Sequence, residues 1–152
     1  MTLRYSIILL ALSPLCAQAS YTTFGLGCGD SWGEPRTRAQ MVLSGVPRIG
    51  QSVQVSGTTA MTATGLVGKS DPYAQTIQAL KTIEAALVQA GASMADVVRT
   101  RIYMANIDQW QEVGRAHGEV FGAIRPATTM VEVKRLIDPD MLIEIEADAI
   151  VS

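Results

Sequence analysis

The clearest pattern of hydrophobic and polar positions in the chain lies between residues 70 and 91. Its apolar residues recur at intervals of three and four, which places them on one face of a helix. They are Tyr73, Ile77, Leu80, Ile83 and Leu87. Ser70 or Asp71 can cap the N-terminus, while Gly91 suits the end. We therefore predict a helix here, and its apolar face needs a sheet or a second helix to cover it.

A strand and a second helix are predicted next. Residues 96–104 read DVVRTRIYM, an alternating pattern that predicts a strand with two unlike faces. One face is expected to carry Val98, Ile102 and Met104, and the other Arg99, Arg101 and Tyr103. The second helix is expected from about residue 106 to residue 122, with an inward stripe of Trp110, Val113, His117, Val120 and Phe121. His117 therefore reads as a core or interface histidine with one nitrogen satisfied, and a catalytic role is the alternative.

Alternation predicts four further strands, at residues 39–42, 52–56, 128–136 and 141–151. The glycines at 57, 65 and 68 are expected to break the chain into short turns. In the last strand, Ile143, Ile145, Ala147 and Ala149 should face the helices, while Glu144, Glu146 and Asp148 face away. The second face of the sheet is therefore predicted to be polar, either solvated or buried between subunits.

The order strand, strand, helix, strand, helix, strand, strand predicts an α+β fold, a mixed sheet with two helices on one face. With 152 residues, of which 48% are hydrophobic and 17% charged, the chain can bury one sizeable core. We assign residues 39–152 to this single domain. Residues 20–38 are rich in glycine and polar side chains, and we interpret them as an N-terminal loop or arm.

The first nineteen residues differ from the rest of the chain. Arg4 precedes the apolar run from Ile7 to Leu12, and small residues follow at Ala17-Gln18-Ala19. This layout is typical of a secretory signal peptide, and the apolar run is shorter than the roughly 20 residues that span a bilayer. We therefore predict export to a periplasmic or secreted location. The alternatives are a cytoplasmic location, in which these residues form an ordinary buried N-terminal strand, or a wrongly chosen start codon.

Charge narrows the range of partners. The formal net charge is −2 with no run of Lys or Arg, so a nucleic-acid partner or an anionic membrane surface is not expected. The two cysteines, Cys16 and Cys28, cannot form an internal disulfide once residues 1–19 are removed.

Five stretches of the sequence resemble the Rid family, also called YjgF/YER057c/UK114. They are KSDPYAQTIQAL, GASMADVVRTRIYM, HGEVFG, RPATTMVEV and IEIEADAIV, and the match runs from Val53 to Val151. The resemblance implies a chorismate-mutase-like fold assembled as a homotrimer, with small-molecule clefts between subunits. It also implies a chemistry without metal or cofactor, because its best-known members hydrolyse reactive enamines and imines, such as 2-aminoacrylate, to ketoacids and ammonia.

The chain departs from the deaminase pattern at the residues that bind substrate. Where that branch has an arginine for the substrate carboxylate, this chain has Thr128, which cannot make a bidentate, charge-assisted contact. Met130 stands where a cysteine is common, and Leu43-Ser44 stand where the N-terminal motif has a tyrosine. Glu144 matches the glutamate that positions water.

Two hypotheses follow from these residues. In the first, the chain is a divergent hydrolase of imines or related C–N compounds, and Glu144 is the general base on water. Thr128 and Thr129 donate hydrogen bonds, Met130 lines the cleft, and Arg101 replaces the anion-binding group. In the second, the chain is a non-catalytic small-molecule binder or structural trimer, and Arg101 and Glu144 form a buried ion pair at the interface. The ribonuclease activity attached to an older family name fits poorly with the acidic charge and the single histidine.

Overall fold

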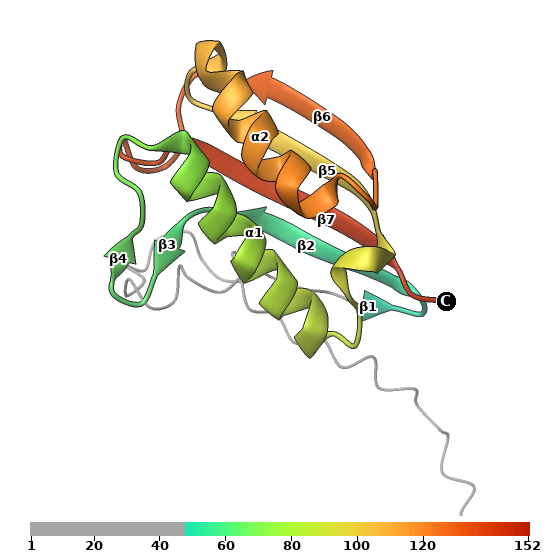
Figure 1. Ribbon diagram of the computed structural model, residues 1–152. Coiled ribbons are helices and arrows are strands. Elements are labelled where there is room, and N and C mark those ends of the chain that lie inside the picture. Colours follow the sequence, from blue (N-terminus) through green and yellow to red (C-terminus); the bar gives the residue numbers. More distant parts are fainter. Residues whose placement is uncertain (1–47) are drawn as a thin grey trace, which may run out of the picture.

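A five-stranded mixed sheet with both helices on the same side forms the body of the molecule (Figure 1). The computed structural model describes residues 48–152. The strands of this sheet are β1 (Arg48–Ile49), β2 (Ser52–Thr58), β5 (Val97–Met104), β6 (Ala127–Glu132) and β7 (Ile143–Ile150). Their order is β1-β2-β7-β5-β6, antiparallel throughout except for the parallel pair β5–β6. The short strands β3 (Met61–Thr62) and β4 (Gly65–Leu66) pair with each other.

This arrangement confirms the predicted α+β class, with a mixed sheet and two helices on one face. The strand predicted at residues 39–42, the arm at 20–38 and the signal peptide at 1–19 lie outside the described residues. Within residues 48–152, no helix combines the length and the apolar character needed to cross a membrane.

Helix α1 (Pro72–Gln89) begins and ends where its signals predict. The Asp71 side chain caps the first turn by accepting a hydrogen bond from the backbone N–H of Ala74, at 3.0 Å. Gly91 adopts a positive φ of 73° just after the helix, a conformation that glycine takes without strain. The buried face is rotated from the prediction, because Tyr73 and Ile77 are only half-buried. Its buried residues are Pro72, Gln75, Thr76, Ala79, Leu80, Ile83, Ala86 and Leu87.

Gln75 explains how a polar residue comes to lie in this buried face. Its side-chain nitrogen donates to the carbonyl oxygens of Gly68 and Asp140, at 3.1 and 2.8 Å. Its side-chain oxygen accepts from the N–H of Leu142 at 2.8 Å. A fully buried amide is tolerated when its hydrogen-bonding groups are satisfied. Gln75 therefore fixes the loop that leads into β7.

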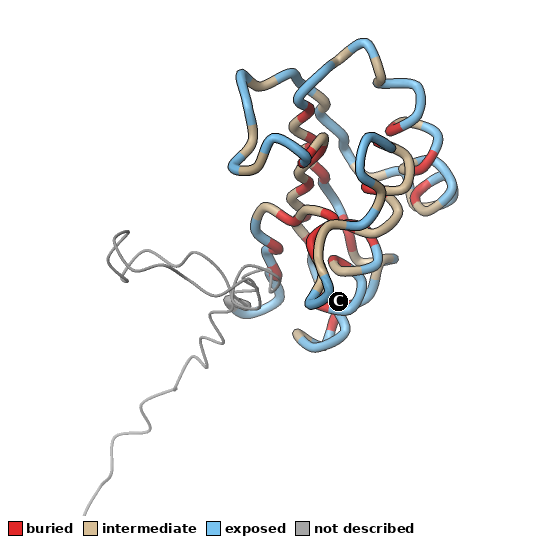
Figure 2. The backbone as a smooth tube through the Cα atoms, turned by 90° about the vertical axis from the view of Figure 1, so that its left-hand side faces the viewer, coloured by how far each residue is buried: buried red, intermediate tan, exposed pale blue. Residues whose placement is uncertain are grey.

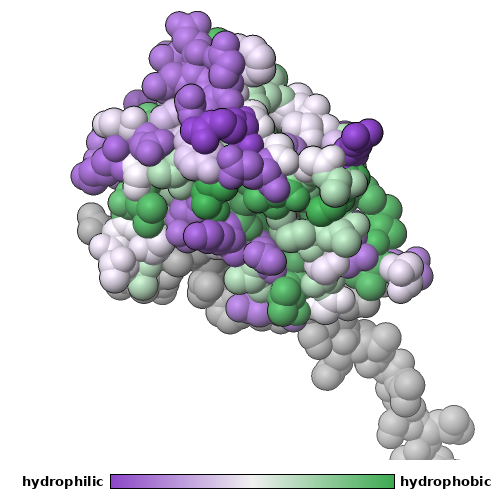
Figure 3. All heavy atoms as spheres, in the orientation of Figure 1, coloured by the Kyte–Doolittle hydropathy of each residue, from purple (hydrophilic) through white to green (hydrophobic). Residues whose placement is uncertain are grey.

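Helix α2 (Trp110–Phe121) follows the 3₁₀ turn η3 (Ile107–Gln109), and its buried residues are Val113, Ala116 and Phe121. Trp110 was predicted to point inward, but its side chain is 52% exposed. Its ring lies beside Gly114, one turn further along α2, where an ideal Cβ would stand 3.9 Å from Cε3 of Trp110. Viewed onto the helices, hydrophilic residues gather over α2, and hydrophobic ones show lower down, over α1 (Figure 3).

The core lies between the helices and the inner face of the sheet. In β7 the predicted alternation is confirmed: Ile143, Ile145, Ala147 and Ala149 are fully buried, and the acidic residues between them are half-buried. Buried and half-buried residues alternate along β7, and Figure 2 shows such an alternation of red and tan in the interior of the molecule.

Two β-bulges interrupt the alternation that the sequence predicts. In β5, Val97 pairs with Ala149 and Arg99 with Asp148, so Val98 is an extra residue. Val98 was predicted to be buried but is 46% exposed, and Val97 takes the inward position instead.

The second bulge lies in β2. Val55 pairs with Ala147 and Thr58 with Ile145, so Ser56 and Gly57 together face the single residue between them on β7. Gly57 was predicted to form a turn, but it lies inside the strand. Glycine within a strand often marks a bulge or a close approach, and both apply here.

Candidate functional site

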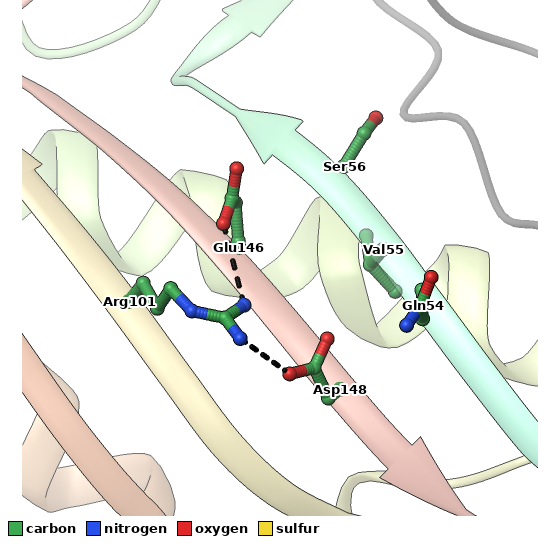
Figure 4. A pocket seen from close by; sticks show the side chains of 6 residues that line it. All are labelled: Gln54, Val55, Ser56, Arg101, Glu146 and Asp148. Carbon is green, nitrogen blue, oxygen red and sulfur yellow. Dashed lines mark hydrogen bonds and ion pairs between the residues drawn. The ribbon is translucent and has the colours of Figure 1, made fainter.

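The outer face of the sheet, opposite the helices, carries an array of polar side chains. Three pairs of residues stand directly across from one another on β5 and β7: Tyr103 and Glu144, Arg101 and Glu146, Arg99 and Asp148. An open depression of about 250 Å³ lies beside this array (Figure 4). It is lined by Gln54, Val55, Ser56, Arg101, Glu146 and Asp148. The prediction of a polar second face is confirmed.

Arg101 is held by two carboxylates of β7 (Figure 4). Its Nη2 atom lies 3.0 Å from Oδ2 of Asp148, and its Nη1 atom lies 3.4 Å from Oε2 of Glu146. The negative charge of Asp148, followed by its hydrogen bond, raises the pKa of Arg101. Within one chain Arg101 therefore pairs with Glu146 and Asp148 and not with Glu144, because the strand register places Glu146 across from it. Nor is Arg101 an uncompensated cation for a substrate anion. The hypothesis of a pair between Arg101 and Glu144 at a subunit interface stays a prediction.

Glu144 occupies a different environment on the same strand. Its carboxylate lies against Gly57 of β2: an ideal Cβ there would come within 2.7 Å of Cδ of Glu144, and closer still to Oε1. Burial, and then the charge of Glu146, raises the pKa of Glu144. Within residues 48–152 this carboxylate has no hydrogen-bond or ion-pair partner. A half-buried carboxylate without a partner is the kind of group that acts as a general acid or base.

Tyr103 is a member of this array that sequence reasoning missed as a site residue. Its hydroxyl donates to Oε2 of Glu146 at 3.2 Å. Burial, and then the charge of Glu146, raises the pKa of this phenol, so the hydroxyl stays protonated at neutral pH. The alternation in β5 placed Tyr103 on the polar face, but only the strand register shows that it stands opposite Glu144.

Thr128 lies on the inner side of the sheet, away from this array. It pairs in register with Thr100 of β5, and their Oγ1 atoms are 2.9 Å apart. Oγ1 of Thr100 in turn lies 3.0 Å from Nε2 of His117 on α2. Thr128 also donates to the carbonyl oxygen of Pro126 at 3.1 Å. A hydrogen-bonded chain therefore runs from helix α2 through the buried Thr100 to the edge strand β6.

The terminal carbonyl fixes the direction of this chain. Each threonine hydroxyl has one proton, so Thr128 donates to Pro126, Thr100 donates to Thr128, and His117 donates from Nε2. His117 is half-buried and stacks on Phe121 with ring centroids 4.7 Å apart. Burial lowers the pKa of His117. The predicted bond to one nitrogen of His117 is present, on a residue that is half-buried rather than in the core.

The remaining two predicted site residues are divided between the faces. Thr129 is exposed and pairs in register with Arg101, on the outer face. Met130 pairs with Ile102 and packs against the core. A single chain therefore brings Glu144, Arg101 and Thr129 to the outer face, and Thr128 and Met130 to the inner one. Across residues 48–152, no group of three or more His, Cys, Asp or Glu side chains is placed to hold a metal ion.

Comparison with known proteins gives matches over most of the chain. The family model described as Endoribonuclease L-PSP matches residues 34–151. A structure from Mycobacterium tuberculosis, described as a member of the highly conserved YjgF/YER057c/UK114 family, is 55% identical. It aligns with a TM-score of 0.63 over 70% of this chain and 84% of its own.

Two more distant relatives agree with this match. A Rid-family protein of unknown function from Yersinia pestis is 32% identical, with a TM-score of 0.66 over 76% of this chain and 96% of its own. An uncharacterised protein of Streptomyces coelicolor is 37% identical over 121 residues, which are 80% of this chain and 87% of the relative. The matched region includes the whole sheet and both helices. The chain therefore belongs to the YjgF/YER057c/UK114 family, also called the Rid family.

Proposed function

We propose that this protein binds a small C–N compound and hydrolyses it, and that its substrates are imines or enamines without a carboxylate. The observation that carries the proposal is the state of Glu144. Its carboxylate is half-buried against Gly57, has no partner among the described residues, and has a raised pKa. A base of this kind takes a proton from water and returns it to the leaving group more readily than an ordinary carboxylate does.

The chemistry needs only water and one acid–base group. Glu144 removes a proton from water as the oxygen attacks the carbon of the C=N bond, and it passes that proton to the nitrogen. Glu144 then takes the hydroxyl proton of the resulting carbinolamine and delivers it to the amine as the C–N bond breaks, which releases ammonia and leaves a carbonyl compound. Each proton that Glu144 takes is given back, so the carboxylate is regenerated in every cycle.

The preference for substrates without a carboxylate rests on two occupied groups. Arg101 already pairs with Glu146 and Asp148. The hydroxyl proton of Thr128 is donated to Pro126, and Thr128 carries no charge. Neither residue provides the free cation that a substrate carboxylate would need.

A homotrimer is part of this proposal, as the family resemblance implies. Among residues 48–152 no helix covers the outer face, and Thr128 lies on the opposite side of the sheet from Glu144. A second subunit on the outer face would enclose the depression and bring further groups to Glu144. Enclosure would also exclude water and strengthen each electrostatic contact in the cleft.

A non-catalytic binding role is the second candidate, and the same ion pairs favour it. The polar groups on this face satisfy one another's hydrogen-bonding capacity, as in a structural network. Arg101 donates to Glu146 and Asp148, and Tyr103 donates to Glu146. In that case the outer face would serve assembly, and the depression would hold a ligand without turnover.

Ammonia release from imines generated in situ separates these roles. The purified protein is tested on imines with and without a carboxylate, together with Glu144→Gln and the matched variant Glu146→Gln. We expect turnover of the carboxylate-free imines, lowered roughly 10²- to 10⁴-fold by Glu144→Gln, the range for loss of a general base. Glu146→Gln makes the same change two residues along, where the carboxylate is already bound, and should keep most of the activity.

Other outcomes are equally decisive. Turnover of carboxylate-bearing imines would contradict the preference inferred from Arg101 and Thr128. No ammonia from either class, with the protein folded and assembled, would exclude imine hydrolysis and leave the binding role.

A further inference from the structure

Gly57 stands where a Cβ would meet the end of the Glu144 side chain, which would have to move. The β2 bulge sets Ser56 and Gly57 against the single residue Glu146 of β7. The Cβ of any other residue at position 57 would project onto the outer face, into the carboxylate of Glu144. We call the space over Gly57, where that Cβ would stand, the Gly57 notch; the carboxylate of Glu144 fills it.

The backbone itself does not demand a glycine at this position. Glycines with positive φ in the described residues are Gly50, Gly65, Gly68 and Gly91, and Gly57 is not among them. Alanine would therefore fit the local backbone without strain. The three atoms nearest to the ideal Cβ of Gly57 all belong to the Glu144 side chain.

The notch also explains how the charges on the outer face are divided. Glu146 and Asp148 pair with Arg101, and Tyr103 donates to Glu146 rather than to Glu144, which stands directly opposite. Glu144 turns instead toward β2, on the far side of β7 from Arg101. Seated there, its carboxylate is set apart from the one cation that its two neighbours share.

We propose that Gly57 is a positioning residue for Glu144: the missing side chain holds the Glu144 carboxylate in the notch, apart from Arg101 and partly out of water. The effect on turnover rests on the function proposed above. The position of the Glu144 carboxylate does not depend on that function, so the position and the effect on turnover can be tested separately.

The seating is tested by a double-mutant cycle on thermal stability. Gly57→Ala is made in the natural chain and in a Glu144→Ala background, where the notch is empty. We expect Gly57→Ala to be less favourable for the melting temperature in the natural chain, where the Glu144 side chain must move, than in the Glu144→Ala background. Gly118→Ala is the control substitution, because no atom lies within 4 Å of its ideal Cβ. An equal loss in both backgrounds would overturn the proposal, as would a double variant that fails to fold.

The titration midpoint of Glu144, measured by NMR of its labelled side-chain carboxyl carbon, reports the position of the carboxylate without any substrate. In Gly57→Ala the midpoint should fall toward the ordinary value for a glutamate, because the displaced carboxylate is hydrated or reaches Arg101. An unchanged midpoint in the folded variant would overturn the proposal. Where Gly57→Ala does not fold, the double variant of the cycle decides the matter.

Activity adds a third measurement. Misplacing a catalytic group by about 1 Å costs roughly 10²-fold in rate, so Gly57→Ala should lower kcat by about that factor and change KM little. The acidic limb of the pH–rate profile should move with the NMR midpoint. A protein inactive on every imine would refute the proposed function while the cycle and the titration still decide the role of Gly57.

Discussion

The two faces of the sheet are built from alternate residues of the same strands, yet they are held together in different ways. On the inner face of β7 the side chains are apolar and fully buried against the helices. On the outer face, one residue away each time, the side chains are charged and half-buried, and Glu144 is left without a partner among the described residues. The comparison indicates that the inner face supplies stability, while the outer face tolerates an unfavourable arrangement of charge. Such tolerance is typical of functional sites.

Adjacent residues of β7 give the strongest test of this contrast. Ile145→Ala removes a fully buried side chain from the inner face, and we expect it to lower the free energy of unfolding by about 2–5 kcal/mol. Glu144→Ala, one residue away, should not lower it at neutral pH. Urea unfolding of both variants measures the difference. Equal losses from the two substitutions would refute the division of roles between the faces.

The polar chain through Thr100 is an exception on the inner face and gives the next largest effect. Thr100→Val keeps the shape of the side chain but leaves His117 and Thr128 without their shared partner. Thr128 is exposed and His117 is half-buried, so we expect a loss of about 0.5–1.5 kcal/mol in the free energy of unfolding, the net contribution of a typical hydrogen bond. Thr129→Val, on the outer face, is the control and should change it by less than about 0.5 kcal/mol. A neutral Thr100→Val would mean that water replaces the lost hydrogen bonds.

The pH dependence of stability gives the smallest effect but the most specific one. The pKa of Glu144 is raised in the folded chain, so the folded state holds its proton more firmly than the unfolded state does. The contribution of Glu144 to stability is present at pH values below its pKa in the unfolded chain. This contribution is lost as pH rises through its pKa in the folded chain. Glu144→Gln should therefore raise the melting temperature at pH 7, with the gain vanishing in acid.

Glu146→Gln is expected to have the opposite sign at pH 7, since it breaks contacts to Arg101 and Tyr103. Calorimetry of the two variants between pH 3 and pH 8 would show both trends. A lower melting temperature for Glu144→Gln at pH 7 would mean that its carboxylate is stabilised in the fold after all.

Local signals in the sequence were enough to predict the elements that carry their own caps and periodicity. Asp71 and Gly91 mark the ends of α1, and the alternation of β7 gives both of its faces correctly. These features depend on nearest neighbours along the chain. The fold class followed from their order.

The site could be predicted only in part, because it depends on register. Nothing in the sequence shows that Ser56 and Gly57 share one partner, or that Val98 is an extra residue in β5. A shift of two residues changes which acid stands across from Arg101, so the sequence alone could not show that this acid is Glu146. Gln75 escaped notice for a similar reason, since its partners lie about 65 residues further along the chain.

The place of β7 at the centre of the sheet has a consequence for how the protein is made. β7 follows all the other described elements in the chain, yet it alone joins the β1–β2 pair to the β5–β6 pair. During synthesis the two halves of the sheet have no shared edge until this strand emerges. Unpaired strand edges expose a growing chain to wrong pairing. The complete sheet can therefore form only after β7 has been synthesised, and a chain cut short before residue 143 would hold two half-sheets with nothing between them.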